Sequence, residues 1–379
     1  MEPLSTAIAT ATPRAYRPSD DCSIYCHPSV VRMSRIGSHE VEAVMAEIVM
    51  GVGSSHGPML STPPDKWGMR ADVDRRNDQL WYRGRTYSFQ QLLAERGGPE
   101  AFAAQIEPEV RRERYARCMD AIAAMGAAVE DVAPDVLVIV TDDQREMFGR
   151  DLQPSLGIYI GDQVEHQPMS DEEVAHLPPS IAVAHKGFTP PEPVSWSCAS
   201  DLARHIVDAV RDRFDLAISE ELPAGTHGNH AVPHGYGFIF QTVLRRRIPV
   251  IPIFLNSFYP PNQPSAARCV AFGAALREAI EGFPEGRRVA VLASGGLTHF
   301  VIEEDFDDAF LKALENEDLD YVRSIPDERL QSGTSEMRNW FVVAGALLGS
   351  GLRFEVIDYV PCYRSEAGTG SAMGFATWR

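Results

Sequence analysis

Three apolar runs of strand length are the feature that most constrains the fold of this chain. They lie at 47–53, 135–140 and 288–293, and each is followed by a polar loop. Largely apolar runs of this length are typical of strands that helices cover on both faces, as in a parallel sheet. In open α/β sheets, the carboxyl ends of the strands line the ligand crevice. The residues that follow these runs are therefore the first candidates for a functional site.

Predicted helices alternate with predicted strands along the chain. Further strands are expected at 214–219, 249–255 and 354–360, and helices at 88–95, 107–131, 200–213, 235–246, 264–281, 305–315 and 335–348. This alternation predicts one α/β domain, residues 45–379, with a largely parallel central sheet flanked by helices and a loop-rich active-site face. The proline-rich stretch 162–196 is expected as an insertion on that face. We expect Thr334 to cap the last helix, and a glycine- and serine-rich tail from Pro361 onward.

Residues 1–44 are rich in Ser, Thr, Pro and Ala and show no sustained period, so we expect a poorly ordered extension. Met45 directly precedes the first strand and is an alternative start. The extension lacks the apolar core of a signal peptide, and no apolar run approaches the length of a membrane span. The 6 cysteines are scattered without a Cys-x-x-Cys pair, which favours a reduced, cytoplasmic protein.

The charge of the chain disfavours one class of partner. Its 379 residues include 35 Lys and Arg against 53 Asp and Glu, a formal net charge of -18. Binding to nucleic acid or to an anionic membrane needs basic residues in excess to neutralise phosphates, and this chain has no such excess. We therefore expect neither a nucleic-acid nor a membrane partner.

Histidines and one carboxylate stand where predicted strands end or helices begin. His56 and His299 each follow a strand among small residues, and Glu336 lies in the first turn of the last helix. His234 belongs to a polar loop, 226–235, that holds two further histidines. A lone histidine is more often structural than a ligand, and a glutamate at a helix start often only complements the helix dipole. The strand-end positions nevertheless favour a functional site.

Two other enzyme classes fit the motifs less well. Ser294-Gly295-Gly296 does not match Gly-x-Ser-x-Gly, so the nucleophile elbow of α/β hydrolases is absent, and hydrolysis is a weaker alternative. Gly51-Val52-Gly53 lacks the third glycine of a dinucleotide-binding turn, because His56 stands in its place.

Three motifs occur in order along the chain: Gly53-Ser54-Ser55-His56-Gly57-Pro58, Ala293-Ser294-Gly295-Gly296-Leu297-Thr298-His299 and Gly333-Thr334-Ser335-Glu336. Together they resemble the class III extradiol ring-cleaving dioxygenases of the protocatechuate 4,5-dioxygenase β-subunit type. Through the segments 55–64 and 358–370 the chain is most similar to the 3-O-methylgallate dioxygenase branch. The resemblance covers the chain from about residue 46 to its end.

The resemblance implies a non-haem Fe(II) site in which two histidines and one carboxylate hold the metal and leave positions for substrate and O₂. His56 matches the first histidine ligand and Glu336 the carboxylate. His299 matches the histidine that acts as acid and base. His234 matches a histidine that lies behind the ligands or contacts substrate. The second histidine ligand falls at Gln144, whose neutral amide oxygen is a weaker ligand than imidazole.

Gln144 leaves several arrangements open. We expect the metal to be held by His56, Glu336 and Gln144. In the alternatives, Asp142 or Asp143 takes the place of Gln144, a water fills the position, or the iron chemistry is lost.

The expected activity is opening of the ring of a small catechol-like aromatic with O₂. A gallate, methylgallate or protocatechuate-like compound, or a hydroxypyridone, is the expected substrate. Arg145, Asn256 and Tyr259 are candidates to bind a ring substituent. The rival prediction is a non-oxygenase paralogue, either a hydrolase or a metal-free binding protein in which Gln144 marks the loss of iron. We also expect a homo-oligomer, a dimer.

Overall fold

The computed structural model describes residues 44–222 and 232–379, so the predicted extension lies outside this part of the chain except for its last residue. The main sheet has nine strands in the order β11-β13-β1-β10-β4-β9-β5-β8, with β12 paired to β13. A second and a third small sheet pair β2 with β3 and β6 with β7. The strands are β1 Glu47–Ser54, β2 Leu80–Tyr82, β3 Arg85–Tyr87, β4 Val136–Asp142, β5 Leu156–Tyr159, β6 Gln163–His166, β7 Val194–Ser197, β8 Ala217–Ser219, β9 Val250–Leu255, β10 Arg288–Ser294, β11 His299–Val301, β12 Phe354–Tyr363 and β13 Thr369–Trp378.

The centre of the main sheet is parallel. β1 pairs parallel with β10, β10 with β4, and β4 with β9. Antiparallel strands flank this centre, because β13 runs antiparallel to β1 and β5 runs antiparallel to β9. The predicted α/β domain with a largely parallel central sheet is confirmed, with antiparallel strands added on both sides.

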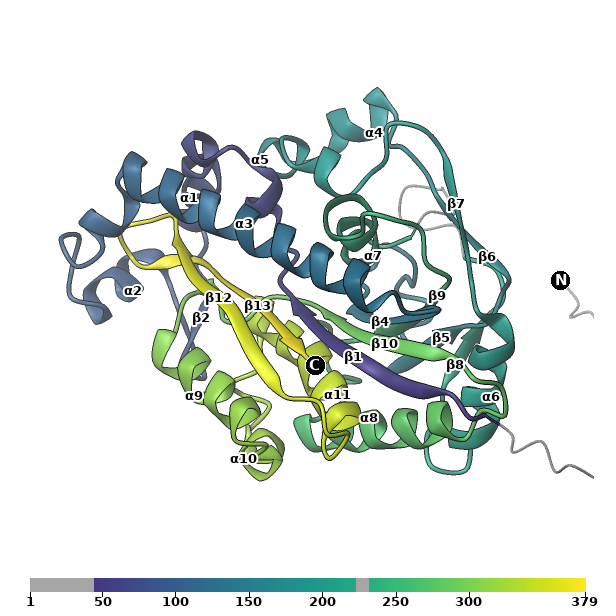
Figure 1. Cartoon of the computed structure of the whole chain (residues 1–379). Helices are drawn as coiled ribbons and strands as arrows, with labels where there is room; N and C mark the ends of the chain where they lie inside the picture. The colour runs from purple at the N-terminus through teal and green to yellow at the C-terminus, as the bar shows by residue number, and fades with distance from the viewer. Residues whose placement is uncertain (1–43, 223–231) are drawn as a thin grey trace, which may run out of the picture. The chain divides into compact units, whose positions relative to one another are not determined.

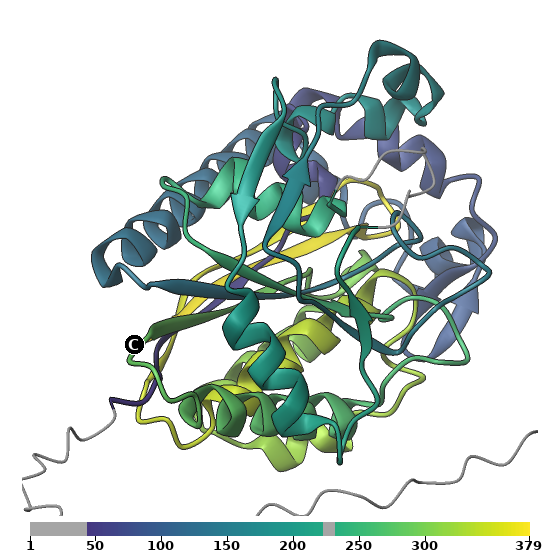
Figure 2. The same ribbon diagram turned by 90° about the vertical axis from the view of Figure 1, so that its right-hand side faces the viewer.

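Helices cover both faces of this sheet (Figure 1). Helices α3 and α7 pack on one face, and α6, α8 and α11 pack on the other. The view in Figure 2 shows the sheet between these two layers. The helices are α1 Gly68–Asp74, α2 Phe89–Glu95, α3 Pro108–Val132, α4 Asp171–His176, α5 Pro179–Ala182, α6 Ser200–Val210, α7 His234–Phe238, α8 Ala266–Glu281, α9 Glu304–Glu315, α10 Leu319–Ser324 and α11 Met337–Leu347.

Strand β4 illustrates why the apolar runs predict buried strands. Val136, Val138 and Val140 point into the core beneath α6 and α8, while Leu137 and Ile139 point into the core beneath α3. Successive side chains of a strand face opposite sides, so a strand between two helical layers needs apolar residues at every position. Each such side chain contributes about 1.5–3 kcal/mol when fully buried.

The C-terminal segment differs most from the sequence prediction. The residues from Pro361 onward do not form a tail, because β12 continues to Tyr363 and β13 pairs with β12, β1 and β11. Every residue of β13 is buried. Its small residues fit close neighbours: a Cβ at Gly374 would lie 2.8 Å from Leu297 Cδ1. Glycine and alanine therefore mark a strand that passes between closely packed layers.

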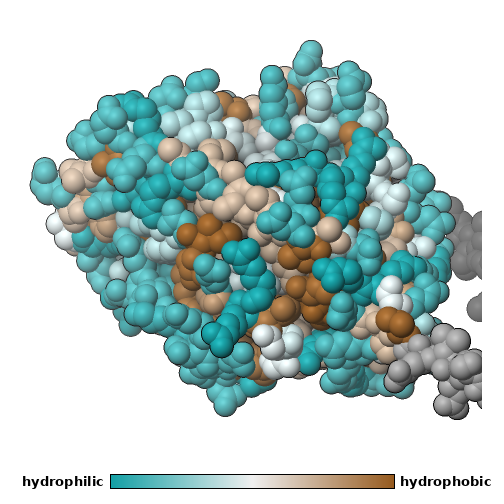
Figure 3. Space-filling view, in the orientation of Figure 1, coloured by the Kyte–Doolittle hydropathy of each residue, from teal (hydrophilic) through white to brown (hydrophobic). Residues whose placement is uncertain are grey.

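Two smaller predictions also change. The helix expected at 235–246 is shorter: α7 ends at Phe238 and is followed by a π-helical segment, Ile239–Val243. The stretch 162–196, expected as loops, contains the β6–β7 pair and the short helices α4 and α5. Polar side chains cover most of the face shown in Figure 3, and apolar ones gather near its centre. Among the described helices, none is both long enough and apolar enough to cross a membrane.

Candidate functional site

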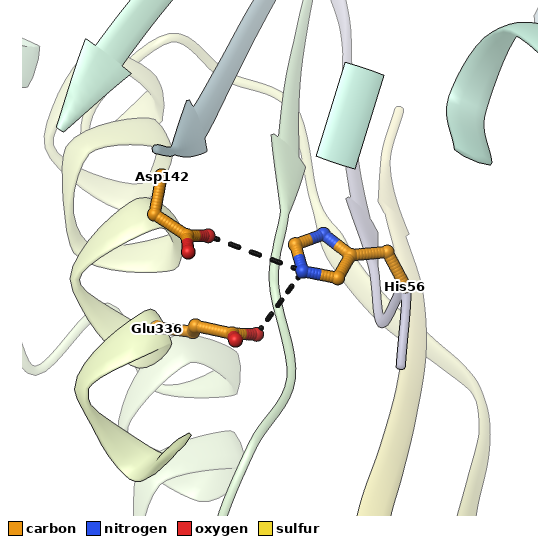
Figure 4. A group of neighbouring side chains, drawn as sticks. All are labelled: His56, Asp142 and Glu336. Carbon is orange, nitrogen blue, oxygen red and sulfur yellow. Dashed lines mark ion pairs between the residues drawn. The ribbon is translucent and has the colours of Figure 1, made fainter. Parts of the chain in front are cut away.

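Three ionisable side chains converge at the carboxyl edge of the parallel strands (Figure 4). His56 follows β1, Asp142 ends β4, and Glu336 ends the 3₁₀ turn Ser332–Glu336 that leads into α11. His56 Nε2 lies 3.9 Å from Asp142 Oδ1 and 3.3 Å from Glu336 Oε2. One potential ligand atom from each residue lies within 4.8 Å of the others, and all three residues are buried. We call these three residues the metal cluster, because their spacing suits a metal ion.

The hydrogen bonds of His56 fix which ring nitrogen carries the proton. Ser294 Oγ donates its only hydrogen to the Gly235 carbonyl at 2.8 Å, so it accepts from His56 Nδ1 at 2.9 Å. Nδ1 is therefore protonated, and Nε2 is the ring nitrogen that faces the two carboxylates and can bind a metal. Nε2 is buried and has no hydrogen-bond partner among the residues that the structure describes. A metal ion is the group that satisfies such a lone pair beside carboxylates.

The two carboxylates carry opposite pKa shifts. Burial and the charge of Glu336 raise the pKa of Asp142. Burial also acts to raise the pKa of Glu336, but His299 and His56 outweigh it and hold that pKa well below its usual range. Gly296 N–H donates to Glu336 Oε2 at 2.8 Å. Two buried carboxylates around one imidazole are oxygen and nitrogen donors whose charge a divalent cation can balance, so the donor set fits a metal.

Gln144, the predicted second ligand, contacts both carboxylates. Its Nε2 donates to Asp142 Oδ2 at 3.3 Å and to Glu336 Oε1 at 3.1 Å. Both partners are acceptors, so the amide presents its NH₂ group to them. In this orientation Gln144 orients the carboxylates, and Asp142 is the third member of the metal cluster.

Asp143, the other alternative, faces away from this cluster. Its carboxylate accepts hydrogen bonds from the backbone N–H groups of residues 146–148 at distances between 2.9 and 3.0 Å. Burial raises the pKa of Asp143 to about 6, although these three donors oppose the shift. Asp143 therefore holds the loop that follows β4.

His299, the predicted acid–base residue, begins β11 and reaches the same edge of the sheet. Its Nδ1 donates to the Leu297 carbonyl at 2.8 Å, and its Nε2 lies 3.2 Å from Glu336 Oε1. Burial acts to lower the pKa of His299, but the Glu336 carboxylate outweighs it and raises that pKa. A Cβ at Gly333 would lie 2.1 Å from His299 Cδ2, and one at Gly296 would lie 2.5 Å from His299 Cε1. The glycines of both motifs thus make room for this ring.

The prediction that Thr334 caps the last helix is wrong. Its hydroxyl donates to the His299 carbonyl at 3.0 Å and accepts from the His299 N–H at 3.1 Å. Helix α11 begins only at Met337, after the 3₁₀ turn. Thr334 therefore fixes the backbone of His299 instead of the helix start.

His234 stands beside the metal cluster at the start of α7. Its ring packs edge-on against that of His56, with centroids 4.7 Å apart. Glu146 accepts from His234 Nδ1 at 2.7 Å and from its backbone N–H at 3.0 Å. Burial acts to lower the pKa of His234, but Glu146 outweighs it and raises that pKa to about 10. His234 is therefore a partly buried imidazolium. The two further histidines of its loop, His227 and His230, lie outside the described residues.

The three predicted substituent contacts gather near Gln144. The Arg145 guanidinium stacks 3.7 Å from the centroid of the Tyr259 ring, and the Tyr259 hydroxyl donates to the Gln144 carbonyl at 3.4 Å. The side-chain amide of Asn256 donates to the Tyr259 carbonyl at 2.7 Å and accepts from the Tyr259 N–H at 2.9 Å. Asn256 thus shapes the turn that carries Tyr259.

Sequence reasoning missed three supporting residues. Ser294 orients His56, Glu146 charges His234, and Asn339 Nδ2 donates to Asp142 Oδ1 at 3.2 Å. Asn339 follows Glu336 by one helical turn, and Ser294 precedes the paired glycines, so each stood beside a residue already selected. Glu146 likewise directly follows Arg145, but its partner His234 is distant in sequence, so the sequence did not indicate this pair.

A cavity of about 260 Å³ opens beside the metal cluster. Gln144, Glu146 and His234 line it, and so do His166 of β6 and the apolar side chain of Phe188. Residues of the 162–196 insertion therefore border the site, as expected from the sequence. The cavity is mostly apolar with a few polar groups, which is typical of small-molecule sites.

Comparison with known proteins identifies relatives of this chain. A 2,3-dihydroxyphenylpropionate/2,3-dihydroxycinnamic acid 1,2-dioxygenase from Comamonas testosteroni is 30% identical over 183 residues, 47% of each chain. A gallate dioxygenase from Pseudomonas putida is 28% identical over 175 residues, 42% of this chain and 49% of the relative. These alignments span about half the length of the curated relatives.

A family match covers a larger part of the chain. Residues 99–370 match the family described as the catalytic LigB subunit of aromatic ring-opening dioxygenase. Asp142, His299 and Glu336 lie within the matched residues, and His56 precedes them. Because the match extends over well more than half of its residues, this chain belongs to the LigB family of aromatic ring-opening dioxygenase subunits.

Proposed function

We propose that this protein opens the ring of a small catechol-like aromatic with O₂, using Fe(II) bound at the metal cluster. The observation that carries the proposal is the buried His56 Nε2, which has no hydrogen-bond partner among the described residues and faces Asp142 and Glu336, in a chain of a ring-opening dioxygenase family. When bound, the metal would bring the diol and O₂ together and would pass electrons from one to the other.

The proposed protein ligands are His56 Nε2 and one oxygen each of Asp142 and Glu336. Gln144 then acts from outside this set, because its amide N–H groups orient the two carboxylates. One neutral imidazole and two carboxylates balance the charge of a divalent cation. Such nitrogen and oxygen donors suit Fe(II), and Mn(II) is the closest competitor on donor type.

His299 is the proposed acid–base residue. Its Nδ1–H is committed to the Leu297 carbonyl, so Nε2 is the atom that takes up and returns a proton. Thr334 fixes the backbone of His299, Gly296 and Gly333 leave room for its ring, and the residue is only 7% exposed. A fixed, water-shielded imidazole suits proton transfer to a bound substrate.

His234 is proposed to bind an anionic oxygen of the substrate. The Glu146 carboxylate keeps its imidazolium charged, and the residue lines the cavity. A charge-assisted hydrogen bond to a catecholate or carboxylate oxygen is roughly twice as strong as a neutral one.

The proposed substrates are small catechol-like aromatics of one ring: gallate, methylgallate or protocatechuate-like compounds, or a hydroxypyridone. A cavity of about 260 Å³ suits a ligand of this size. The names of both relatives refer to aromatic compounds of this kind. The roles of Arg145, Asn256 and Tyr259 toward a ring substituent stay predictions, as do the cytoplasmic location and the homodimer.

A hydrolase or a metal-free binding protein is less well supported. A serine hydrolase of the α/β-hydrolase type uses a nucleophile elbow, and the Ser294 motif does not provide one. Without a cation, Asp142 and Glu336 are buried side by side in a place where burial opposes the charge of both.

Metal loading and turnover test the proposed function together. Protein purified without oxygen is loaded with Fe(II), its metal content is measured, and O₂ uptake is followed with protocatechuate, gallate and 3-O-methylgallate. We expect near-stoichiometric iron and O₂-dependent formation of a ring-opened product from at least one compound. Glu336→Ala should lose the metal, while Asp305→Asn, which changes an exposed carboxylate on α9, should keep it. Protein that never retains a divalent metal, or opens no catechol ring, contradicts the proposal.

A further inference from the structure

Asn339 is a fully buried amide beside the metal cluster to which the proposed function gives no role. It lies in the first turn of α11, one helical turn after Glu336. Its Nδ2 donates to Asp142 Oδ1 at 3.2 Å and to the Ser294 carbonyl oxygen at 2.8 Å. A Cβ at Gly295 would lie 2.7 Å from this nitrogen, so the glycine after β10 leaves room for the amide.

The hydrogen bonds of Asn339 fix the direction of its amide. The Ser294 carbonyl can only accept, so the atom that faces it is Nδ2 with its hydrogens, and the same NH₂ group reaches Asp142. The amide oxygen Oδ1 is buried and has no hydrogen-bond partner within 44–222 and 232–379. An unpaired buried acceptor destabilises a fold, so packing alone does not explain an amide at this position.

This NH₂ group joins the elements that carry the metal cluster. Asn339 belongs to α11, which begins directly after Glu336, and Asp142 ends β4. Ser294 ends β10, and its hydroxyl oxygen accepts from His56 Nδ1 at 2.9 Å. Asn339 therefore contacts one proposed ligand directly and also contacts the residue that orients a second.

The contact with Asp142 is the one on which the site depends more. Thr141 Oγ1 also donates to the Ser294 carbonyl, at 2.9 Å, so this carbonyl keeps a donor when Asn339 is removed. The Asp142 carboxylate is held at both oxygens, Oδ1 by Asn339 and Oδ2 by Gln144 at 3.3 Å. Removal of Asn339 therefore releases Oδ1, the oxygen that faces the cluster histidine.

A fixed Asp142 matters because the site holds a second carboxylate. One potential ligand atom of Asp142 and one of Glu336 lie within 4.8 Å of each other, and Figure 4 shows both side chains directed toward His56. Like charges at this distance repel each other in a buried site, so an unrestrained Asp142 side chain is driven away from Glu336 when no metal is bound. A metal would then have to reorder Asp142 before binding, which lowers affinity.

We propose that Asn339 is a positioning residue that holds the Asp142 carboxylate in place for the metal. This inference rests on the proposed function and adds a residue through which α11 controls a ligand on β4. Gln144 differs from Asn339, because it contacts both carboxylates and lines the cavity. Substitution of Asn339 therefore tests the position of Asp142 without changing a residue of the cavity wall.

Fe(II) affinity and folding stability together test this role. Asn339→Ala removes the amide and keeps a strong helix former in α11. Val343→Ala is the matched control, because it removes buried apolar volume one turn further along the same helix. Affinity is measured by competition with a chelator without oxygen, and the free energy of unfolding of the metal-free protein by chemical denaturation. We expect Asn339→Ala to bind Fe(II) about 10–100-fold more weakly. Val343→Ala should lower the free energy of unfolding and keep the wild-type affinity.

A double variant shows through which residue Asn339 acts. In a chain that carries Asp142→Ala, the Asn339 amide has lost the carboxylate that it is proposed to position. Addition of Asn339→Ala should then change the Fe(II) affinity by no more than about twofold, as expected when one residue acts only through the other. A residue that only supports the fold would instead lower the affinity in both backgrounds.

The outcomes distinguish this inference from the proposed function. Wild-type affinity in Asn339→Ala overturns the role of Asn339 and leaves the proposed function standing. A further loss when Asn339→Ala is added to Asp142→Ala overturns it as well, and so does an equal loss of affinity in Val343→Ala. If the wild-type protein binds no divalent metal, the proposed function fails, and the role of Asn339 fails with it.

Discussion

Asp142 and Gln144 both reach the metal cluster from the end of β4, and metal affinity separates their roles. Gln144→Ala removes a hydrogen-bond donor to the two carboxylates, a change that typically costs 10–100-fold in metal affinity. Asp142→Ala removes a proposed ligand, so we expect a larger loss. Competition with a chromogenic chelator without oxygen measures both affinities. If Gln144→Ala loses the metal and Asp142→Ala keeps it, the ligand set expected from the sequence is right and the one proposed here is wrong.

A substitution of His299 can separate proton transfer from metal and substrate binding. His299 is not one of the proposed metal ligands, and its Nε2 is the proposed proton carrier. We expect His299→Phe to keep Fe(II) and to bind a catechol without oxygen, while ring opening slows by about 10²–10⁴-fold. Metal analysis, the absorption change on catechol binding and O₂ uptake measure the three properties. Loss of iron in this variant, or turnover at the wild-type rate, would contradict the assignment.

The sequence was enough to select most residues of the site, but it was not enough to select the ligand that β4 contributes. His56, Glu336 and His299 were selected because they follow strands or begin a helix, and the structure brings them together. The choice among residues 142, 143 and 144 depends on side-chain direction. Alternate residues of a strand face opposite sides, which groups Asp142 with Gln144 and separates Asp143. Which of the two then faces His56 depends on distances that only the packed structure gives.

At the scale of elements, β1 and α11 pack so closely that one methyl group matters. A Cβ at Gly53 would lie 2.2 Å from Trp340 Cζ3, and Trp340 Nε1 donates to the Gly295 carbonyl at 2.8 Å beside the cluster. We expect Gly53→Ala to lower the free energy of unfolding by about 1–3 kcal/mol through overpacking. Gly68→Ala is the control, because a Cβ there meets nothing within 4 Å. Chemical denaturation measures both, and equal stability of the two variants would contradict the predicted strain.

The elements that the sequence missed have a shared physical cause. The predicted strands β1, β4, β9 and β10 are largely apolar and bury both faces, so composition reveals them. Strand β13 is equally buried, but it contains glycines, a serine and alanines because its neighbours lie very close to it. It therefore shows no apolar run. Close approach between layers is a tertiary property. A pattern of hydrophobicity along one segment therefore does not report it.

At the scale of the whole molecule, the sheet divides most of the buried apolar residues into two large cores, and the site lies where the strands emerge from between them. One core holds α6, α8, α9 and α11, and the other holds α3 and α7. His56 and Asp142 lie at the ends of β1 and β4, and Glu336 immediately precedes α11. The two cores hold these three elements in place. A site on rigid elements keeps its ligands in position without a metal.

Asp307 connects several parts of the molecule and should make its stability depend on pH. Its carboxylate accepts from the Thr298 N–H at 2.9 Å, the Thr298 hydroxyl at 2.6 Å and the Tyr359 hydroxyl at 2.7 Å, which links α9 to β12. Burial outweighs these donors and raises the pKa of Asp307 to about 7. The unfolded chain releases this proton near its ordinary pKa of about 3.9.

Between about pH 4 and pH 7, the folded protein therefore holds a proton that the unfolded chain has lost. Stability falls as the pH rises through this window, by up to about 1.4 kcal/mol per pH unit, and this contribution levels off above it. Asp307→Asn removes the titrating group, so its free energy of unfolding should fall less steeply than that of the wild type between pH 5 and pH 7. Asp308→Asn changes an exposed neighbour and should keep the wild-type slope. Denaturant titrations across this range give the slopes, and parallel curves for wild type and Asp307→Asn would show that Asp307 is already ionised in the folded protein.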